Sequence, residues 1–129
     1  MQWSSAELQG CIVASPDGRV DEATAQAFTD HLTSSVTMAA ESPGKKLIVD
    51  FGGLDYMSSR GLRALTLAKR QADAAGVAMA LARPNEVMRE ILAISRYDKI
   101  FPVADSIEAA MLSRKAAERS CRSLRAWSS

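Results

Sequence analysis

The chain has 129 residues, of which 47% are hydrophobic, and a formal net charge of +1. This length suits one domain, and the hydrophobic share is large enough for a core, which excludes a wholly disordered chain. The nearly balanced charge gives no general electrostatic basis for binding nucleic acid or a membrane surface. No apolar run approaches the roughly 20 residues of a membrane-spanning helix. The N-terminus lacks a secretion signal pattern, so we expect a cytoplasmic protein with Cys11 and Cys121 reduced.

The N-terminal part of the sequence predicts a hairpin followed by a helix. Residues 8–14 form an apolar strand, residues 16–18 (Pro-Asp-Gly) are typical of a turn, and residues 19–20 begin a returning strand. Asp21 is a suitable N-cap for the helix that follows. The apolar stripe of that helix recurs every three or four residues and consists of Ala25, Phe28, Leu32 and Val36.

Two continuous apolar runs, residues 46–51 and 77–81, predict strands that are covered on both faces. Between them we expect a helix that follows Gly61 and ends at Gly76. Its apolar stripe consists of Leu62, Leu65, Ala68, Ala72 and Ala75. A third helix is expected to begin with Pro84 as its first residue. The residues that we expect it to bury are Val87, Ile91 and Ile94.

The C-terminal part predicts a short strand, a helix and a basic tail. Residues 100–103 suit an edge strand, because Pro102 argues against a central position. A last helix follows Asp105, and the residues that face inward from it are Ile107, Ala110 and Met111. The alternation of strands and helices indicates a small α/β domain over residues 1–113. Residues 114–129 are basic and form either a tail or an extension of the last helix.

Signatures of catalysis or metal binding are missing from the sequence. His31 is the only histidine, and we expect it at the surface or at the boundary of the core. There is no Gly-x-Ser-x-Gly, no dinucleotide-binding glycine pattern and no phosphate-binding loop. Asp50 and Asp55 lie across a turn, where capping or helix-dipole use is favoured over an acid/base pair. We therefore predict neither an enzyme nor a bound metal or cofactor.

The segment of residues 54–65 has unusual local chemistry. Ser58 or Ser59 falls at the start of a helix, where one hydroxyl suffices to cap free backbone N–H groups. A second serine exceeds that need, and Gly61 is a poor helix former. Close approach of another backbone or of a partner explains a glycine there better. From the residues alone, a capped helix start and a partner-binding surface both stay open.

Residues 47–65, LIVDFGGLDYMSSRGLRAL, resemble the central motif of the STAS family, particularly of the bacterial anti-sigma factor antagonists. In that motif an apolar strand ends in Asp and a turn, before an aromatic and an aliphatic residue, Asp-Ser or Ser-Ser, a small residue and Gly-Leu. Residues 18–21 are similar to a Gly-x-x-Asp feature after the first hairpin, and residues 91–111 resemble the family's C-terminal helices. The resemblance implies a four- or five-stranded mixed sheet with an antiparallel first strand and about four helices largely on one face.

The resemblance further implies a binding module that phosphorylation controls. Ser59 matches the serine that a partner kinase phosphorylates, Ser58 is a competing acceptor, and Arg60 stands where a small residue is usual. The unphosphorylated protein, a monomer or weak dimer, would bind an anti-sigma factor kinase of the GHKL ATPase type and so free a sigma factor. A PP2C-type phosphatase would remove the phosphate. The residues that we expect to contact the partner are Asp21, Thr24, Met57, Ser58, Ser59, Arg60 and Arg63.

Three alternatives accompany these expectations. Met57 is equally consistent with a place in the core, because it is an apolar residue near a strand. A scaffold subunit of a membrane transport system, either an ABC or an anion transporter, is a second function to which STAS domains are suited. A nucleotide-binding or lipid-binding STAS protein is a third.

Overall fold

The computed structural model describes residues 2–112, and the basic segment of residues 114–129 lies outside the described residues. Within residues 2–112 the chain forms six strands, four α-helices and one 3-10 helix. The strands are β1 (Gln2–Leu8), β2 (Cys11–Val20), β3 (Lys46–Asp50), β4 (Gly53–Met57), β5 (Ala78–Ala82) and β6 (Val103–Ala104). The helices are α1 (Ala25–Ala40), α2 (Ser59–Ala75), α3 (Glu86–Ser95) and α4 (Ile107–Leu112), with the 3-10 helix at Tyr97–Lys99.

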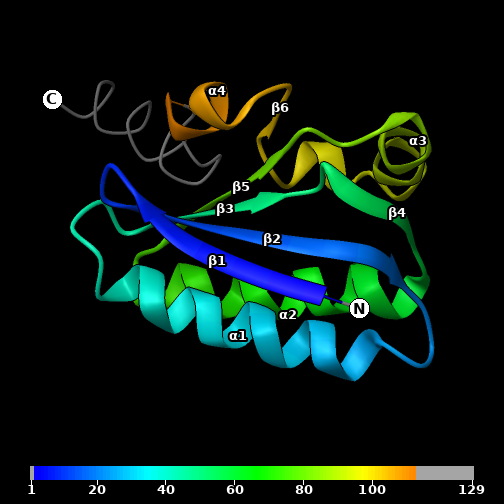
Figure 1. The fold of residues 1–129 in the computed structure, drawn as a ribbon, viewed down its shortest axis with the longest axis horizontal. Coiled ribbons are helices and arrows are strands. Elements are labelled where there is room, and N and C mark those ends of the chain that lie inside the picture. The colour runs from blue at the N-terminus through cyan, green and yellow to red at the C-terminus, as the bar shows by residue number, and fades with distance from the viewer. Residues whose placement is uncertain (1, 113–129) are drawn as a thin grey trace, which may run out of the picture.

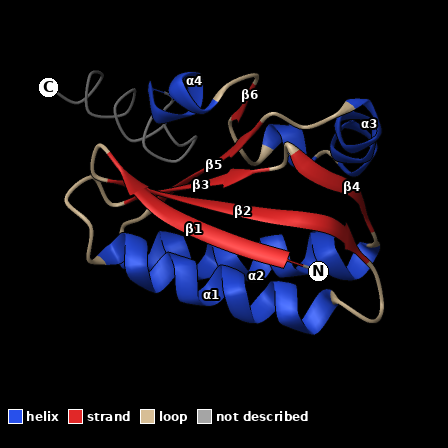
Figure 2. Cartoon of the chain, in the orientation of Figure 1, coloured by secondary structure: helices blue, strands red, loops and turns tan. Residues whose placement is uncertain are grey.

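The strands form one mixed sheet in the order β1-β2-β3-β5-β6 (Figure 1). Only β1 runs antiparallel to its neighbour among the described strands, as expected for a mixed sheet with an antiparallel first strand. The parallel connections pass through helices, so α1 and α2 lie side by side on one face and α4 lies on the other (Figure 2). This arrangement confirms the predicted α/β fold with a mixed sheet, but the described residues form six strands where four or five were expected. The helices are also not gathered on one face, because α4 lies opposite α1 and α2 (Figure 2). The short strand β6 lies at the sheet edge.

The strand β4 was not predicted from the sequence. It continues the direction of β3 after Gly52 and pairs in parallel with the second half of β2, while β3 pairs with the first half. The side chain of Asn85 at the start of α3 donates a hydrogen bond to the Leu54 carbonyl oxygen, 3.1 Å away. The helix α3 therefore packs beside β4, at the end of the sheet that also carries the start of α2 (Figure 1).

The hairpin turn lies at residues 9–10, between β1 and β2, and not at residues 16–18 as the sequence predicted. Gln9 and Gly10 form the turn with φ of 52° and 83°, the left-handed conformation that two-residue hairpins require. Pro16, which was expected in that turn, is instead inside β2 and opposite Trp3 of β1. It stands where β2 passes from its pairing with β3 to its pairing with β4, a gap in the parallel ladder that tolerates a missing N–H group.

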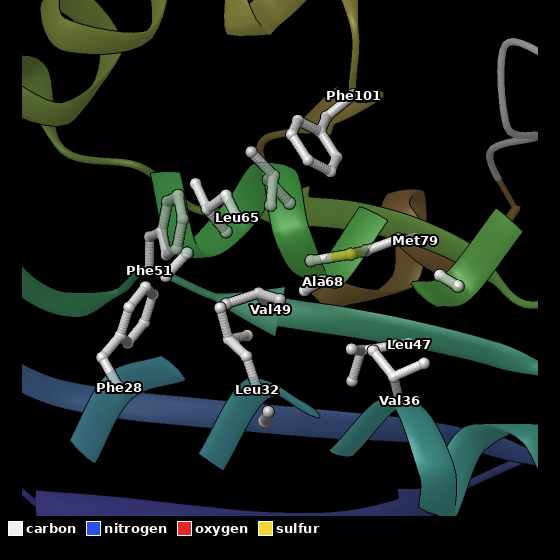
Figure 3. Close-up of a cluster of buried hydrophobic side chains, with 14 of the residues drawn as sticks. Phe28, Leu32, Val36, Leu47, Val49, Phe51, Leu65, Ala68, Met79 and Phe101 are labelled. Carbon is white, nitrogen blue, oxygen red and sulfur yellow. The ribbon is translucent and has the colours of Figure 1, made fainter. Parts of the chain in front are cut away.

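The main hydrophobic cluster lies between the sheet and the helices α1 and α2 (Figure 3). Its labelled members in Figure 3 are Phe28, Leu32, Val36, Leu47, Val49, Phe51, Leu65, Ala68, Met79 and Phe101. The predicted stripe of α1 is fully buried there. A smaller cluster on the opposite face holds Ala110 of α4, with Ile107 and Met111 packed against it, which confirms the predicted inward face of α4.

The predicted register of α3 is wrong. The helix begins at Glu86, and the N-cap is Asn85, whose Oδ1 accepts a hydrogen bond from the Met88 N–H at 2.8 Å. The buried residues are Met88 and Leu92. Of the residues expected inside, Val87 is 48% exposed, Ile94 is 79% exposed and Ile91 is half-buried. Two neighbouring apolar stripes on this helix both satisfy the helical period, and contact with the unpredicted strand β4 selects the other one.

Candidate functional site

The end of β2 and the start of α2 meet at one edge of the molecule. Val20 and Met57, the last residues of β2 and β4, are opposite each other in the parallel ladder. The Ser58 N–H then donates a hydrogen bond to the Val20 carbonyl oxygen at 2.8 Å. This pairing brings the turn after Val20 beside the first residues of α2, so both predicted contact segments, residues 21–24 and 58–63, belong to the same region of the surface.

A tight turn at residues 21–24 precedes α1. The Asp21 carboxylate accepts hydrogen bonds from the Ala23 N–H at 3.0 Å and the Thr24 N–H at 3.2 Å. The Thr24 hydroxyl donates to the Arg19 carbonyl oxygen at 2.9 Å. Because Thr24 is the N-cap of α1, the prediction that Asp21 caps this helix is wrong by one turn. Desolvation opposes ionisation of Asp21, but hydrogen bonds from Thr24 and Ala23 outweigh it and hold the pKa below its ordinary value.

The two serines at the start of α2 differ in their surroundings. Ser58 is the N-cap residue, yet its side chain makes no capping hydrogen bond, so the expectation of a serine cap is not met. Its Oγ is buried and has no hydrogen-bond partner among residues 2–112. Ser59 is the first residue of the helix and is exposed. The helix therefore begins two residues before Gly61, and not after it as predicted.

Gly61 is required by the packing of the core beneath the site. A Cβ atom at this position would lie 2.4 Å from Cγ of Met57 and 2.8 Å from Cγ1 of Val20. The close approach predicted for this glycine is thus made by two core side chains, and not by another backbone or a partner. Met57 is 2% exposed, which confirms the alternative that it belongs to the core, and it offers no surface to a partner.

Gly61→Ala is expected to lower the free energy of unfolding by about 1–2 kcal/mol. Overpacking costs about 1–3 kcal/mol, and the better helix propensity of alanine returns up to about 1 kcal/mol. Urea unfolding followed by circular dichroism measures the difference. Met57→Ala makes room for the new methyl group, so Gly61→Ala should cost less in that background. A Gly61→Ala protein as stable as the parent would show that the core yields without cost.

The two arginines of this surface differ in their surroundings. Nε of Arg60 lies 3.2 Å from a carboxylate oxygen of Glu22, and both side chains are mostly exposed. The ion pair bridges the turn before α1 and the first turn of α2, and it directs the Arg60 guanidinium toward that turn. Arg63, one turn further along α2, lines a groove of about 320 Å³ between α1 and α2. The residues that line this α1/α2 groove are Ala25, Gln26, Thr29, Arg60, Arg63, Ala64 and Leu67.

An ion pair between the buried Asp50 and the half-exposed Arg83 fixes the junction between β3 and β4. Asp50 accepts hydrogen bonds from Nε of Arg83 at 2.9 Å and from Nη2 at 2.7 Å, and its Oδ1 also accepts the Gly52 N–H. Arg83 lies so close over Gly52 that a Cβ there would be 2.5 Å from Nη2. Burial raises the pKa of Asp50, but the hydrogen bonds from Arg83 and Gly52 prevail and lower it. The prediction that Asp50 serves a helix end is therefore wrong.

The remaining titratable candidates show no catalytic grouping. His31 is exposed and stacks on Trp3 with ring centroids 4.9 Å apart, in agreement with a surface position. Asp55 is exposed on β4, on the far side of the turn from the buried Asp50. In the described part of the chain, no group of three His, Cys, Asp or Glu side chains is placed to hold a metal ion. No helix among residues 2–112 is long and apolar enough to cross a membrane.

Comparison with known proteins agrees with this fold. The family model of the STAS domain matches residues 2–110. The chain is 32% identical over 117 residues to BtrV of Bordetella bronchiseptica, which is named as an anti-sigma factor antagonist, and the match covers 91% of this chain and 97% of BtrV.

Solved structures of antagonists share the fold. An anti-sigma factor antagonist from Mycobacterium paratuberculosis superposes with a TM-score of 0.75 at 19% identity, over 85% of this chain and 90% of that one. Unphosphorylated SpoIIAA gives a TM-score of 0.66 at 16% identity, over 84% and 92% of the two chains. The phosphorylated form of SpoIIAA from Bacillus gives a TM-score of 0.60 at 18% identity, over 84% and 96%.

The chain thus belongs to the STAS domain family, and its homology with BtrV places it with the anti-sigma factor antagonists of that family.

Proposed function

We propose that this protein binds an anti-sigma factor when Ser59 is unmodified and releases it when Ser59 carries a phosphate. The observation that carries the proposal is the contrast between the adjacent serines. Ser59 is exposed at the start of α2, where a kinase can reach its hydroxyl, whereas the Ser58 Oγ is buried. Of the two acceptors that the sequence left open, the contrast in exposure favours Ser59.

The chemistry of the region supports a switch of this kind. A phosphate adds about −1.5 to −2 charges. At the start of α2 the helix dipole favours an anion, so the modification is tolerated within the protein itself. The unfavourable free energy then falls on the interface, where the phosphate must be desolvated against a partner that fits the neutral hydroxyl. A surface formed by residues 21–24 and the exposed residues of the first turns of α2 is the part of the partner's binding site that this chain supplies.

The proposed partners follow from the same scheme. The anti-sigma factor is a serine kinase of the GHKL type that uses ATP to phosphorylate Ser59, and a PP2C-type phosphatase restores the binding form. The chain is a binding module and a kinase substrate in this scheme, and it acts in the cytoplasm where ATP and sigma factors are found. BtrV, with which the chain shares 32% identity, supports the assignment of an anti-sigma factor as the partner.

Phosphate mapping tests the proposal. The purified protein is incubated with Mg-ATP and candidate GHKL-type anti-sigma factors from its own host, and fragment-ion mass spectrometry locates the phosphate. We expect modification of Ser59, its loss in Ser59→Ala and its retention in Ser58→Ala. Modification of Ser58 alone, or of neither serine with any candidate, would contradict the proposal. Co-purification with a membrane transport complex would favour the scaffold function.

A further inference from the structure

Arg63 combines two features that the switch described above does not use. It lines the α1/α2 groove, whose lining includes two arginines, three apolar side chains and no acidic one. Among the residues that the structure describes, Arg60 forms an ion pair with Glu22, whereas no ion pair is found for Arg63. The groove therefore presents an apolar floor beside a cation that is available for an anion.

Arg63 also lies four residues after Ser59 in the same helix. Residues at this spacing share a helix face, with Cβ atoms about 6 Å apart. Helical side chains lean toward the N-terminus, so the long Arg63 side chain extends back toward Ser59. A phosphate on Ser59 would thus stand within reach of the Arg63 guanidinium, which matches phosphate oxygens with two parallel hydrogen bonds.

We propose that Arg63 exchanges one anion for another when the switch operates. In the unmodified protein Arg63 binds a carboxylate of an acidic partner segment that is seated in the α1/α2 groove. In the phosphorylated protein the Ser59 phosphate forms an ion pair with the Arg63 guanidinium. Arg63 is then no longer free to bind a carboxylate in the α1/α2 groove. This inference rests on the proposed function for the identity of the partner, and charge complementarity selects an acidic occupant.

The other charges around the site do not replace Arg63 in this role. Arg60 already has the Glu22 carboxylate as its partner, and Arg19 lies 3.4 Å from a carboxylate oxygen of Asp21. Asp21 and Glu22 thus pair with Arg19 and Arg60, and Arg63 is an arginine of this surface for which no ion pair is found among residues 2–112. Arg70 provides a matched control, because it is an exposed arginine of the same helix two turns, or about 10 Å, further from Ser59.

The first test measures the phosphate itself and does not depend on the host kinase. Phosphoserine is incorporated at position 59 during translation, and phosphorus NMR follows its second ionisation, ordinarily near pH 6. Arg63→Ala is expected to raise that pKa by about 0.2 to 0.4, which is the free energy of an exposed ion pair one helical turn apart converted to a pKa difference. Arg70→Ala should leave it unchanged. Equal pKa values in the parent and Arg63→Ala, or equal shifts in both variants, would overturn the proposal.

The second test measures binding to the anti-sigma factor that phosphorylates Ser59. Unphosphorylated Arg63→Ala is expected to bind it about five- to tenfold more weakly than the parent, while Arg70→Ala binds unchanged. Phosphorylation should then weaken binding of the Arg63→Ala protein by a correspondingly smaller factor than binding of the parent. The reason is that this variant has no Arg63 contact with the partner that the phosphate could remove. Unchanged binding by Arg63→Ala would overturn the exchange. So would a factor of weakening by phosphorylation that is the same in Arg63→Ala as in the parent. If no kinase modifies Ser59, the proposed function fails while the NMR test still decides the contact.

Discussion

Ser59→Asp is expected to weaken binding to the anti-sigma factor by more than a hundredfold, whereas Ser59→Ala is expected to bind like the unmodified protein. The carboxylate places a charge in the proposed interface, which is complementary to a small neutral side chain. A loss of about 3 kcal/mol of binding free energy already corresponds to more than a hundredfold in Kd. Alanine removes only the hydroxyl and cannot be phosphorylated, so its complex should persist in the presence of Mg-ATP. Isothermal titration calorimetry with the purified anti-sigma factor measures both variants.

Two controls separate this effect from general consequences of charge. Ser34 is exposed in the middle of α1, so Ser34→Asp adds the same charge away from the proposed interface and should leave Kd unchanged. Ser58→Ala removes a buried hydroxyl that has no hydrogen-bond partner in the described structure, so it should leave both folding and binding intact. Equal affinity of Ser59→Asp and Ser59→Ala for every candidate anti-sigma factor would show that Ser59 does not control binding.

Arg83→Ala is expected to lower the free energy of unfolding by about 2 kcal/mol at pH 7. Removing one partner of a buried ion pair costs about 3–5 kcal/mol, but the Arg83 side chain is 50% exposed and its contribution is screened by solvent. The Asp50 carboxylate, 7% exposed, would keep the Gly52 N–H and lose both guanidinium hydrogen bonds. Chemical denaturation across a pH series provides the measurement.

The pH dependence of this effect has a definite sign. The folded state lowers the pKa of Asp50, so the pair's stabilisation is complete above the unfolded value of about 3.9 and is lost as the pH falls through the folded value. The stability difference between the parent and Arg83→Ala should therefore be largest near neutral pH and shrink below about pH 4. Arg89 and Asp105 form a more exposed pair, and Arg89→Ala should cost less than about 1 kcal/mol. A constant difference down to pH 2 would show that Arg83 acts through packing alone.

The parts of the fold that could be predicted are those with one dominant local signal. Three local patterns are each consistent with only one structure. They are the buried apolar runs of β3 and β5, the apolar stripe of α1 and the helix-terminating Gly76. The predicted position of the hairpin turn was wrong because Pro-Asp-Gly is a stronger turn signal in sequence than Gln-Gly. What overrides it is the parallel pairing of residues 17–20 with β4, a long-range contact that local propensity does not contain.

The candidate site was predictable in position but not in its internal arrangement. The motif placed Ser58 and Ser59 at the start of a helix, but Asp21 was predicted only as a helix N-cap, and the turn at residues 21–24 was not predicted. Which serine is exposed depends on how Gly61 packs over Met57 and Val20, and that depends on the β2–β4 pairing. Likewise Asp50 and Arg83, which are distant in sequence, become partners only because β3 and β5 are adjacent.

The hydrogen bond from the Ser58 N–H to the Val20 carbonyl oxygen joins the ends of β2 and β4. Binding of the proposed partner therefore depends on β2 and β4 staying paired. If local opening separates β4 from β2, the two halves of the proposed surface separate as well, and the apparent Kd rises in inverse proportion to the closed fraction. A bound anti-sigma factor would in turn hold the edge closed by mass action. Under the proposed switch, phosphorylated molecules lack that partner, and they would then be the more readily degraded population.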